Sequence, residues 1–302
     1  MQYVTIGKTG VRVSRLCFGT MSFSSYSNAE TSKAMFQRAR DEGINFFDAA
    51  NSYAGGQAET ILGECIAESK SRDEIVLISK VCRPMSADIN GRGLSRKHIM
   101  QEVENSLRRL RTDRVDFYFV HHYDPLTPVE ETLRALDDLQ RQGKILYTAV
   151  SNWAAWRIAK ALGVSARDSL ARFELIQPMY NLVKRQPEVE LFPLALSEEL
   201  GVIVYSPLAS GLLTGLYGVG KRPNRGRLLE ARYSKRYADA TNYEIADRFT
   251  DFAQARGFNP SSLAVAWAMS HPAVTAPIIG AETIEQLEGY FGALHINMTR
   301  EL

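Results

Sequence analysis

Short apolar segments recur along the chain and alternate with stretches of helical periodicity. Eight of these segments are rich in β-branched or aromatic residues and are apolar nearly throughout, which is typical of parallel strands covered on both faces. The pattern therefore predicts eight strands, at Leu16–Thr20, Asn45–Ala50, Ile75–Lys80, Val115–His122, Ile145–Asn152, Phe173–Tyr180, Gly201–Leu208 and Val274–Gly280.

Helices are predicted between these strands. The clearest covers Pro128–Gly143, where the proline opens the helix, two glutamates occupy its first turn and the glycine ends it. Apolar residues at every third or fourth position give this segment one buried stripe. A second helix is predicted over Lys97–Arg111, whose last turn collects arginines, as suits the negative end of the helix dipole.

Strand and helix alternate in units of roughly 33 residues, the pattern of βαβ repeats, and eight such units predict a closed (β/α)8 barrel, or TIM barrel. An open doubly wound sheet is the alternative, but no GxGxxG motif follows any predicted strand. Residues 2–14, with Gly7 and Gly10 in the middle, predict an N-terminal β-hairpin that closes the bottom of the barrel. A single domain is expected over residues 1–302.

Two segments that follow strands are longer than the others. Val81–Arg96 comes after the third strand, and Ala209–Ala240 comes after the seventh. Loops after strands form the C-terminal face of a barrel, where barrel enzymes place their catalytic groups. Chemistry is therefore expected among these long loops.

Chemically distinct side chains occur where consecutive strands end. Asp48 lies near the end of the second strand with Tyr53 just beyond it, Lys80 ends the third, and His121 lies at the end of the fourth. A charged residue at the end of an apolar strand is costly to bury alone, so Asp48 and Lys80 are expected to pair. Lys80 close to Tyr53 would lower the pKa of the phenol from about 10, so that it could donate a proton near neutral pH.

Each of these residues also has a purely structural interpretation: a salt bridge, a tyrosine covering the rim and a histidine satisfied in the core. Their convergence at adjacent strand ends favours catalysis. A metal site is not expected, because the five histidines show no HxH or HExxH spacing. His121 and His122 are adjacent on a strand and so point to opposite faces.

The composition adds limits on partners and compartment. With 302 residues, 36 basic against 34 acidic side chains and a net charge of +2, the chain has little field to attract nucleic acid or an anionic membrane. Its start has no apolar leader, and its three cysteines form no CxxC pair, which favours a reducing cytoplasm. The uncharged stretch Gly201–Gly220 contains five glycines and a proline, so it predicts a strand and loop, not a membrane helix.

Beyond these arguments, the chain resembles the aldo-keto reductases, and in particular a bacterial-type member similar to the potassium-channel β-subunit branch. The resemblance lies first in Phe47–Tyr53 followed by Gly56–Gly63. It continues in order along nearly the whole chain through Ser79-Lys80, Asp116–Thr132, Gly143–Ile145, Val150–Trp153, Gln177–Asn181, Tyr205–Leu208 and Pro277–Ala281.

The resemblance implies a barrel that binds a nicotinamide cofactor, usually NADP(H), without a dinucleotide-binding domain. It implies that Tyr53 is the general acid, that Asp48 and Lys80 tune its pKa and that His121 orients a small carbonyl substrate. The residues it implies for cofactor binding are Thr20, Met21, Ser151, Asn152, Gln177 and Tyr205 at the nicotinamide end, Ser206, Leu208 and Ser210 at the pyrophosphate, and Gly280, Glu282 and Gln286 toward the adenosine.

The far end of the cofactor site departs from the family pattern, in which a lysine commonly stands where this chain has Leu216. A carboxylate at Glu282 would repel a 2′-phosphate and suit NAD. Yet the loop Lys221–Arg236 is strongly basic, and Arg225 or Arg227 could clamp the phosphate. NADP is the expected cofactor, with NAD or dual use as the alternative.

Three functions remain to be compared. A carbonyl reductase or alcohol dehydrogenase is favoured by the complete set of rim residues. A regulatory subunit that senses the cofactor with little turnover is the alternative. A barrel glycosidase would need two free rim carboxylates, whereas Asp48 is expected to be committed to Lys80. The substrate, the reaction direction and the oligomeric state are not determined by the sequence.

Overall fold

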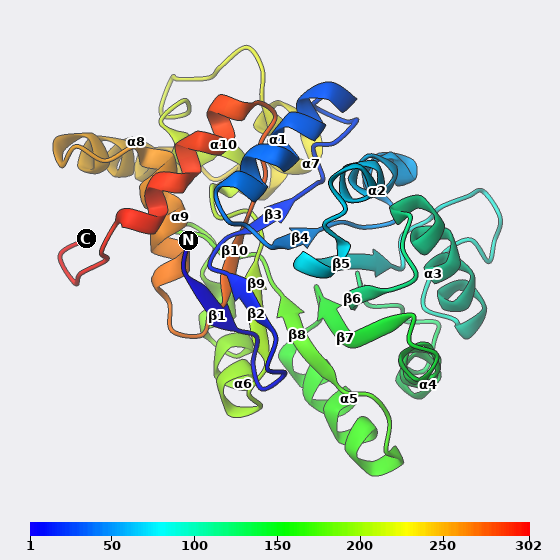
Figure 1. Cartoon of the computed structure of the whole chain (residues 1–302). Coiled ribbons are helices and arrows are strands. Elements are labelled where there is room, and N and C mark those ends of the chain that lie inside the picture. The colour runs from blue at the N-terminus through cyan, green and yellow to red at the C-terminus, as the bar shows by residue number, and fades with distance from the viewer.

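A computed structural model describes residues 1–302, and its centre is a closed barrel of eight parallel strands (Figure 1). Around the barrel the strand order is β10-β3-β4-β5-β6-β7-β8-β9, so neighbours in sequence are neighbours in space. The prediction of a TIM barrel is confirmed. The strands are β3 (Cys17–Gly19), β4 (Phe46–Asp48), β5 (Val76–Val81), β6 (Val115–Val120), β7 (Ile145–Ser151), β8 (Phe173–Gln177), β9 (Gly201–Val204) and β10 (Ala276–Ile279).

Helices surround the barrel (Figure 1). The two that were predicted in detail both form, within one or two residues of their expected ends. At the start of the helix predicted over Lys97–Arg111, the Ser95 hydroxyl accepts a hydrogen bond from the His98 amide, which is a typical N-cap. The helices are α1 (Ala29–Asp41), α2 (Gln57–Ser69), α3 (Arg96–Leu110), α4 (Val129–Arg141), α5 (Ala155–Asp168), α6 (Leu191–Ser197), α7 (Ala231–Ser234), α8 (Ala240–Ala255), α9 (Pro260–Ser270) and α10 (Ile284–Phe291).

The N-terminal hairpin forms as predicted, from β1 (Tyr3–Thr5) and β2 (Arg12–Ser14). Ile6 and Val13 are fully buried in one apolar cluster with residues from the inside of the barrel, so the hairpin plugs its bottom. Gly7 is required at the contact: it has a φ of +45°, and a Cβ there would lie 2.4 Å from the Glu199 carbonyl oxygen.

Several strands are shorter than the apolar runs that predicted them. The run Phe173–Tyr180 continues as a strand only to Gln177, and the run Gly201–Leu208 only to Val204. Pro178 and Pro207 lie in the missing parts and cannot donate ladder hydrogen bonds. Residues at these strand ends are therefore free to line the top of the barrel.

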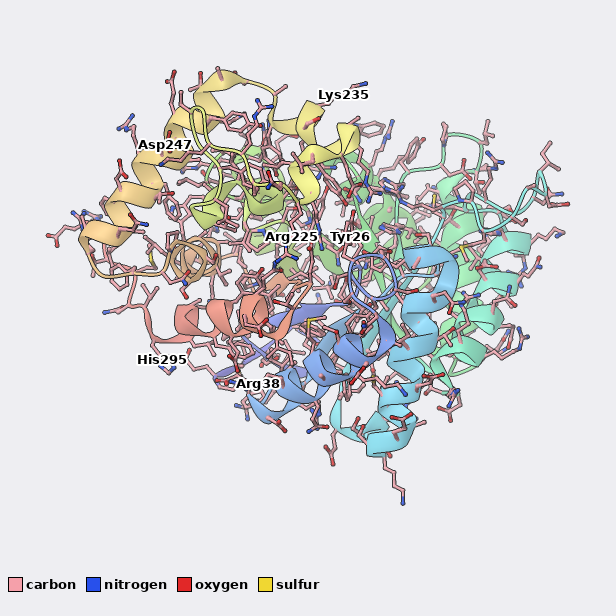
Figure 2. The ribbon with its side chains drawn as sticks, turned by 90° about the horizontal axis from the view of Figure 1, so that it is seen from above. Tyr26, Arg38, Arg225, Lys235, Asp247 and His295 are labelled. Atoms are coloured by element: carbon pink, nitrogen blue, oxygen red, sulfur yellow. The ribbon has the colours of Figure 1, made fainter.

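The long segment after β9 folds into short helical turns and crosses the C-terminal face toward the β3–α1 loop. Figure 2 views this face from above, with Arg225 of the segment and Tyr26 of the loop labelled. The segment contacts the loop through Glu230, which accepts a hydrogen bond from the Tyr26 hydroxyl, and through Arg232, whose guanidinium lies 3.0 Å from the same oxygen.

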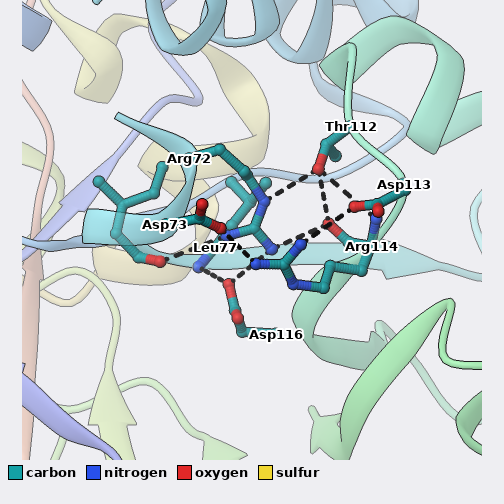
Figure 3. Close-up of polar contacts among 8 residues, drawn as sticks. Arg72, Asp73, Leu77, Thr112, Asp113, Arg114 and Asp116 are labelled. Carbon is teal, nitrogen blue, oxygen red and sulfur yellow. Dashed lines mark hydrogen bonds and ion pairs between the residues drawn. The ribbon is translucent and has the colours of Figure 1, made fainter. Parts of the chain in front are cut away.

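A polar network ties together the opposite, N-terminal ends of β5 and β6 (Figure 3). The carboxylate of Asp116 accepts a hydrogen bond of 2.7 Å from the Leu77 amide and lies 3.0 Å from the Arg72 guanidinium. Arg72 also donates to the Thr112 hydroxyl and to the Arg114 carbonyl oxygen, both at 2.9 Å. Through these contacts Arg72, which lies just before β5, connects the start of β5 to the turn that precedes β6.

We expect Asp116→Ala to lower the free energy of unfolding by about 1–3 kcal/mol, because it leaves the Leu77 amide and part of the Arg72 guanidinium without an acceptor. Urea denaturation measures the change. Asp113→Ala is the matched control: its side chain is 83% exposed, so its removal should change stability by no more than about 0.5 kcal/mol. Equal effects of the two substitutions would contradict the role given to the buried network.

Candidate active site

A cleft of about 1070 Å³ opens at the C-terminal ends of the barrel strands. Its walls come from the strand ends, from the loop after β5 and from the long segment after β9. Most of the residues predicted from the sequence line it: Met21, Asp48, Tyr53, His121, Asn152, Gln177, Tyr205, Ser206, Leu208, Ser210, Arg225, Arg227, Gly280, Glu282 and Gln286. The topology thus brings groups from residue 21 to residue 286 into one space.

Lys80 lies beneath the floor of this cleft, fully buried in β5. Its ammonium is 2.6 Å from the Asp48 carboxylate and donates to the Ala49 carbonyl oxygen at 2.8 Å. It also donates to the Tyr53 hydroxyl oxygen at 3.1 Å. Because Tyr53 accepts this hydrogen bond, its own proton remains available to the cleft.

The turn that carries Tyr53 is held from behind by charged residues that the sequence analysis did not identify. Ala54, Gly55 and Gly56 all have positive φ, and a Cβ at Gly56 would lie 2.9 Å from the Arg109 side chain. Arg109 in turn donates to the buried Glu59 at 2.7 Å. Glu59 is a charged residue in the first turn of α2, just after the tight turn, and this position could have suggested a structural ion pair. Its partner could not be identified from the sequence, because Arg109 lies 50 residues away in α3.

Burial raises the pKa of Tyr53 above its ordinary value of 10, and the nearby charge of Lys80 acts in the opposite direction. The expectation of a lowered pKa is therefore wrong for the net shift, because the cost of burying a phenolate exceeds the attraction of the ammonium. Burial by itself lowers the pKa of Lys80, but Asp48 and Tyr53 outweigh it and the net pKa is raised. Lys80 therefore stays charged at neutral pH and limits the upward shift of Tyr53.

His121 forms the adjoining wall and is buried, with 6% of its surface exposed. Burial lowers its pKa well below 6.5, and the cation of Lys80 adds to this, so the ring is neutral at pH 7. Its Nδ1 has no hydrogen-bond partner within the protein. The ring packs edge-on to Tyr53 at 5.9 Å and stacks on His122 at 5.0 Å. Both histidines line the cleft. The expectation that they point to opposite faces is therefore wrong, because β6 ends at Val120 and the alternation of a strand does not extend to them.

Asn152, Gln177 and Tyr205 lie beside Asp48 and Tyr53 in the cleft. The Tyr205 hydroxyl donates to the Asn152 side chain at 2.9 Å, and the Gln177 amide donates to Asp48 at 2.8 Å. Two other predicted residues lie behind this wall and do not line the cleft. Thr20 and Ser151 are buried, and their hydroxyls donate to the carbonyl oxygens of Asp48 and Gln177.

The segment after β9 turns sharply where the pyrophosphate-binding residues were expected. Ser206, Ala209, Ser210 and Gly211 all have positive φ, between +52° and +99°. Non-glycine residues adopt this conformation rarely, and clusters of them occur at ligand-binding turns. The Ser210 hydroxyl is buried at the cleft wall and approaches Tyr237 without a hydrogen bond of good geometry.

Comparison with known proteins identifies the family to which this cleft and barrel belong. The model of the Aldo/keto reductase family matches residues 15–301. The chain belongs to the aldo/keto reductase family.

Named relatives of this aldo/keto reductase span nearly its whole length. It is 36% identical to the "Uncharacterized oxidoreductase YrpG" of Bacillus subtilis, over 100% of this chain and 94% of the relative. It is 35% identical to a "Probable voltage-gated potassium channel subunit beta" of Arabidopsis thaliana, over 98% and 92% of the two chains. "Protein tas" of Escherichia coli is 31% identical over 100% and 95%. The protein is thus an oxidoreductase of this family.

The far end of the aldo/keto reductase cleft differs from the sequence interpretation. Arg227 faces Glu282 at 3.9 Å and lies 5.1 Å above the Tyr26 ring. Glu282 therefore has a cationic neighbour, 55 residues earlier in the sequence, that was not foreseen. Arg225 and Leu216 also line the cleft, and Arg225 pairs with no carboxylate.

The structure adds cleft residues that sequence reasoning missed, among them Arg83, Tyr217, Tyr233, Asn259 and Ser261. Arg83 lies two residues beyond the end of β5, so its position just after Lys80 could have predicted that it lines the cleft. The others come from helices or from the long segment, where position along the chain says little about direction. No group of three metal-ligating side chains lies close enough to bind a metal ion, and none of the helices has the length and apolar character needed to cross a membrane.

Proposed function

We propose that the protein interconverts an aldehyde or ketone and an alcohol with NAD(P)H, with Tyr53 as the general acid and base. One observation carries the proposal: the Tyr53 hydroxyl, 3.1 Å from the buried Lys80 ammonium, faces a large cleft beside a neutral histidine. A phenol in this setting has its oxygen anchored and its proton directed at substrate. Measuring NADPH and NADH oxidation against a panel of aldehydes, ketones and sugars tests it, and no turnover with any of them would contradict it.

The residues present fit a nicotinamide cofactor. The strained turn at Ser206–Gly211, with the poorly satisfied Ser210 hydroxyl, suits a pyrophosphate, and the Tyr205 ring offers a face for the nicotinamide. Asn152 and Gln177 would bind its carboxamide. When bound, the cofactor supplies the hydride for the carbonyl carbon.

The protein's own groups handle the proton and the developing negative charge. As the carbonyl oxygen gains negative charge, Tyr53 transfers its proton to that oxygen. The phenolate left behind is stabilised by the Lys80 ammonium, whose charge is balanced by Asp48. His121, neutral and adjacent to Tyr53, would orient the carbonyl oxygen.

Cofactor choice depends on the cations at the far end of the cleft, and NADP is the cofactor that they favour. We expect Arg225→Ala to weaken NADPH by about 10- to 150-fold relative to NADH, because one charge-assisted hydrogen bond to the 2′-phosphate is worth about 1.5–3 kcal/mol. Fluorescence titration of both cofactors measures the ratio. Arg222→Ala is the control, since Arg222 lies in the same loop but outside the cleft. A wild type that already prefers NADH, with a ratio unmoved by Arg225→Ala, would contradict the phosphate role.

Glu282 and Arg227 supply a second test at the same end. We expect Glu282→Gln to tighten NADPH relative to NADH by a few-fold, because it releases Arg227 from its acidic neighbour and removes a charge that repels phosphate. The double variant Glu282→Gln/Arg227→Ala should lose this gain. If Glu282→Gln instead weakens NADH alone, Glu282 binds the ribose hydroxyls and the enzyme is built for NAD.

A regulatory subunit that senses the cofactor is the second candidate, because similar proteins carry the name of a potassium channel β-subunit. The complete arrangement of Asp48, Tyr53, Lys80 and His121 favours the enzyme. Turnover decides between them: a sensor would bind NADPH tightly yet release less than one product per bound cofactor in the time of an ordinary assay.

A further inference from the structure

The substrate end of the cleft carries a cation that nothing in the protein neutralises. Arg83, in the loop after β5, lines the same cavity as Tyr53 and makes no ion pair. Its guanidinium contacts the His122 Nε2 at 2.7 Å. His122 is uncharged at neutral pH, because burial and the charge of Arg83 itself lower its pKa to about 4. The contact therefore orients the guanidinium without cancelling its charge.

Carboxylates in the cleft are committed elsewhere. Three line it: Asp48 is paired with Lys80, Glu282 faces Arg227, and Glu285 lies in the first turn of α10 at the far end. Two further acids lie in or near the loop after β5. Asp124 accepts hydrogen bonds from the Leu94 and Leu126 amides, and Asp88, in the loop itself, accepts one from the Asn90 amide; neither forms an ion pair with Arg83. The free charge of Arg83 thus has no acidic partner from the protein.

The place of Arg83 favours substrate over cofactor. It follows β5, which lies on the opposite side of the barrel from β9, the strand that leads into the proposed pyrophosphate turn. His122 connects it to the catalytic centre, because the His122 ring stacks on His121. Its charge also acts on Tyr53, whose pKa burial raises and Arg83 lowers. An anionic group bound here would therefore lie close to the carbonyl held at His121.

We propose that Arg83 recognises an oxyanion on the substrate, so that the preferred substrates are short aldehydes or ketones bearing a carboxylate or a phosphate. The planar guanidinium keeps donors free beyond its contact with His122 and can bind either group through two hydrogen bonds. This inference rests on the proposed carbonyl reduction and narrows its substrate class.

Matched substrate pairs test the proposal. One pair is 4-oxobutanoate and its methyl ester, and the other is glyceraldehyde 3-phosphate and glyceraldehyde, so the two arms separate carboxylate from phosphate recognition. We expect wild-type kcat/KM for the charged member of at least one pair to exceed that of the neutral member by about tenfold or more, chiefly through KM. The preference should fall as sodium chloride is raised, because salt screens exposed charges.

Arg83→Met should reduce the charged-to-neutral ratio of kcat/KM by about 10- to 100-fold. Arg83→Lys should restore part of this ratio, because lysine returns the positive charge but cannot form the two parallel hydrogen bonds of a guanidinium. Arg92→Met is the control, because Arg92 is exposed on the same loop and does not line the cleft. Equal kcat/KM within both pairs, or a ratio unchanged by Arg83→Met, would overturn the proposal.

Binding without turnover separates this inference from the proposed function. Succinate has a carboxylate at each end and no reducible carbonyl, and its binding can be followed by calorimetry. Weaker succinate binding in Arg83→Met would support the oxyanion site even in a protein that turned over no carbonyl. Turnover of neutral aldehydes without charge preference would overturn the oxyanion site alone, and absence of both turnover and succinate binding would overturn both proposals.

Discussion

Replacing Tyr53 by phenylalanine should lower kcat by at least the roughly 10²- to 10⁴-fold expected for loss of a general acid. The ring and its edge-on contact with His121 are retained, and only the hydroxyl that lies 3.1 Å from Lys80 is removed. NADPH affinity should stay within a few-fold, because the cofactor residues belong to other strand ends. Steady-state kinetics and fluorescence titration on the same preparation measure the two quantities.

Tyr147→Phe is a matched control for this substitution. Tyr147 lies in β7 and its hydroxyl makes only a long contact of 3.4 Å with the Thr9 carbonyl oxygen, at the bottom of the barrel. We expect its removal to leave kcat unchanged. Wild-type turnover in Tyr53→Phe would show that the assigned acid is wrong, whereas loss of cofactor binding in the same variant would indicate a disturbed rim.

Replacing Lys80 by methionine should impair both catalysis and stability. Asp48 would then be a buried carboxylate without its cation, and removing one partner of such a pair costs about 3–5 kcal/mol of unfolding free energy. Tyr53 would lose the charge that opposes the effect of burial, so its pKa should rise further and its phenolate should be less stable. Activity should fall steeply.

The pH profile separates these effects. A general acid must be protonated, so activity declines as pH rises through the pKa of Tyr53, and a higher pKa moves this alkaline limb to higher pH. We expect that upward shift in any residual activity of Lys80→Met. The double variant Asp48→Asn/Lys80→Met should regain stability in urea denaturation without regaining activity, because it removes the stranded charge but not the need for the ammonium. An unchanged alkaline limb in an active Lys80→Met enzyme would contradict the tuning role.

The barrel was predictable because each of its signals is local. Parallel strands covered on both faces require continuous apolar runs, and helices require an apolar stripe with capping residues, whatever the rest of the chain does. The same topology makes strand ends converge, which is why Asp48, Tyr53, Lys80 and His121 could be grouped from their positions along the chain. Strand ends were predicted less well, and β8 ends at Gln177, directly before Pro178, which has no amide to donate to the ladder.

Burial and partners at a distance could not be predicted. The net pKa shift of Tyr53 depends on how much protein surrounds the phenol. Thr20 and Ser151 lie behind the cleft wall, where their hydroxyls donate hydrogen bonds to the carbonyl oxygens of Asp48 and Gln177. The sequence offered Glu282 and Arg227 separately, as a charge that repels phosphate and a charge that binds it, and did not predict that the two would face each other. These outcomes depend on the packing of several elements at once.

The amino-acid sequence by itself determined the order of strands and helices, the family and the candidate catalytic residues, since all three follow from periodicity and from motifs read along the chain. The tertiary structure alone decided which charges remain free. Arg83 meets His122 across 39 residues and Arg227 meets Glu282 across 55, and neither distance leaves a periodic signal. Charges act through space, so only the folded chain shows that the cation of Arg83 stays without an acidic partner, whereas at the far end Arg227 is paired with Glu282.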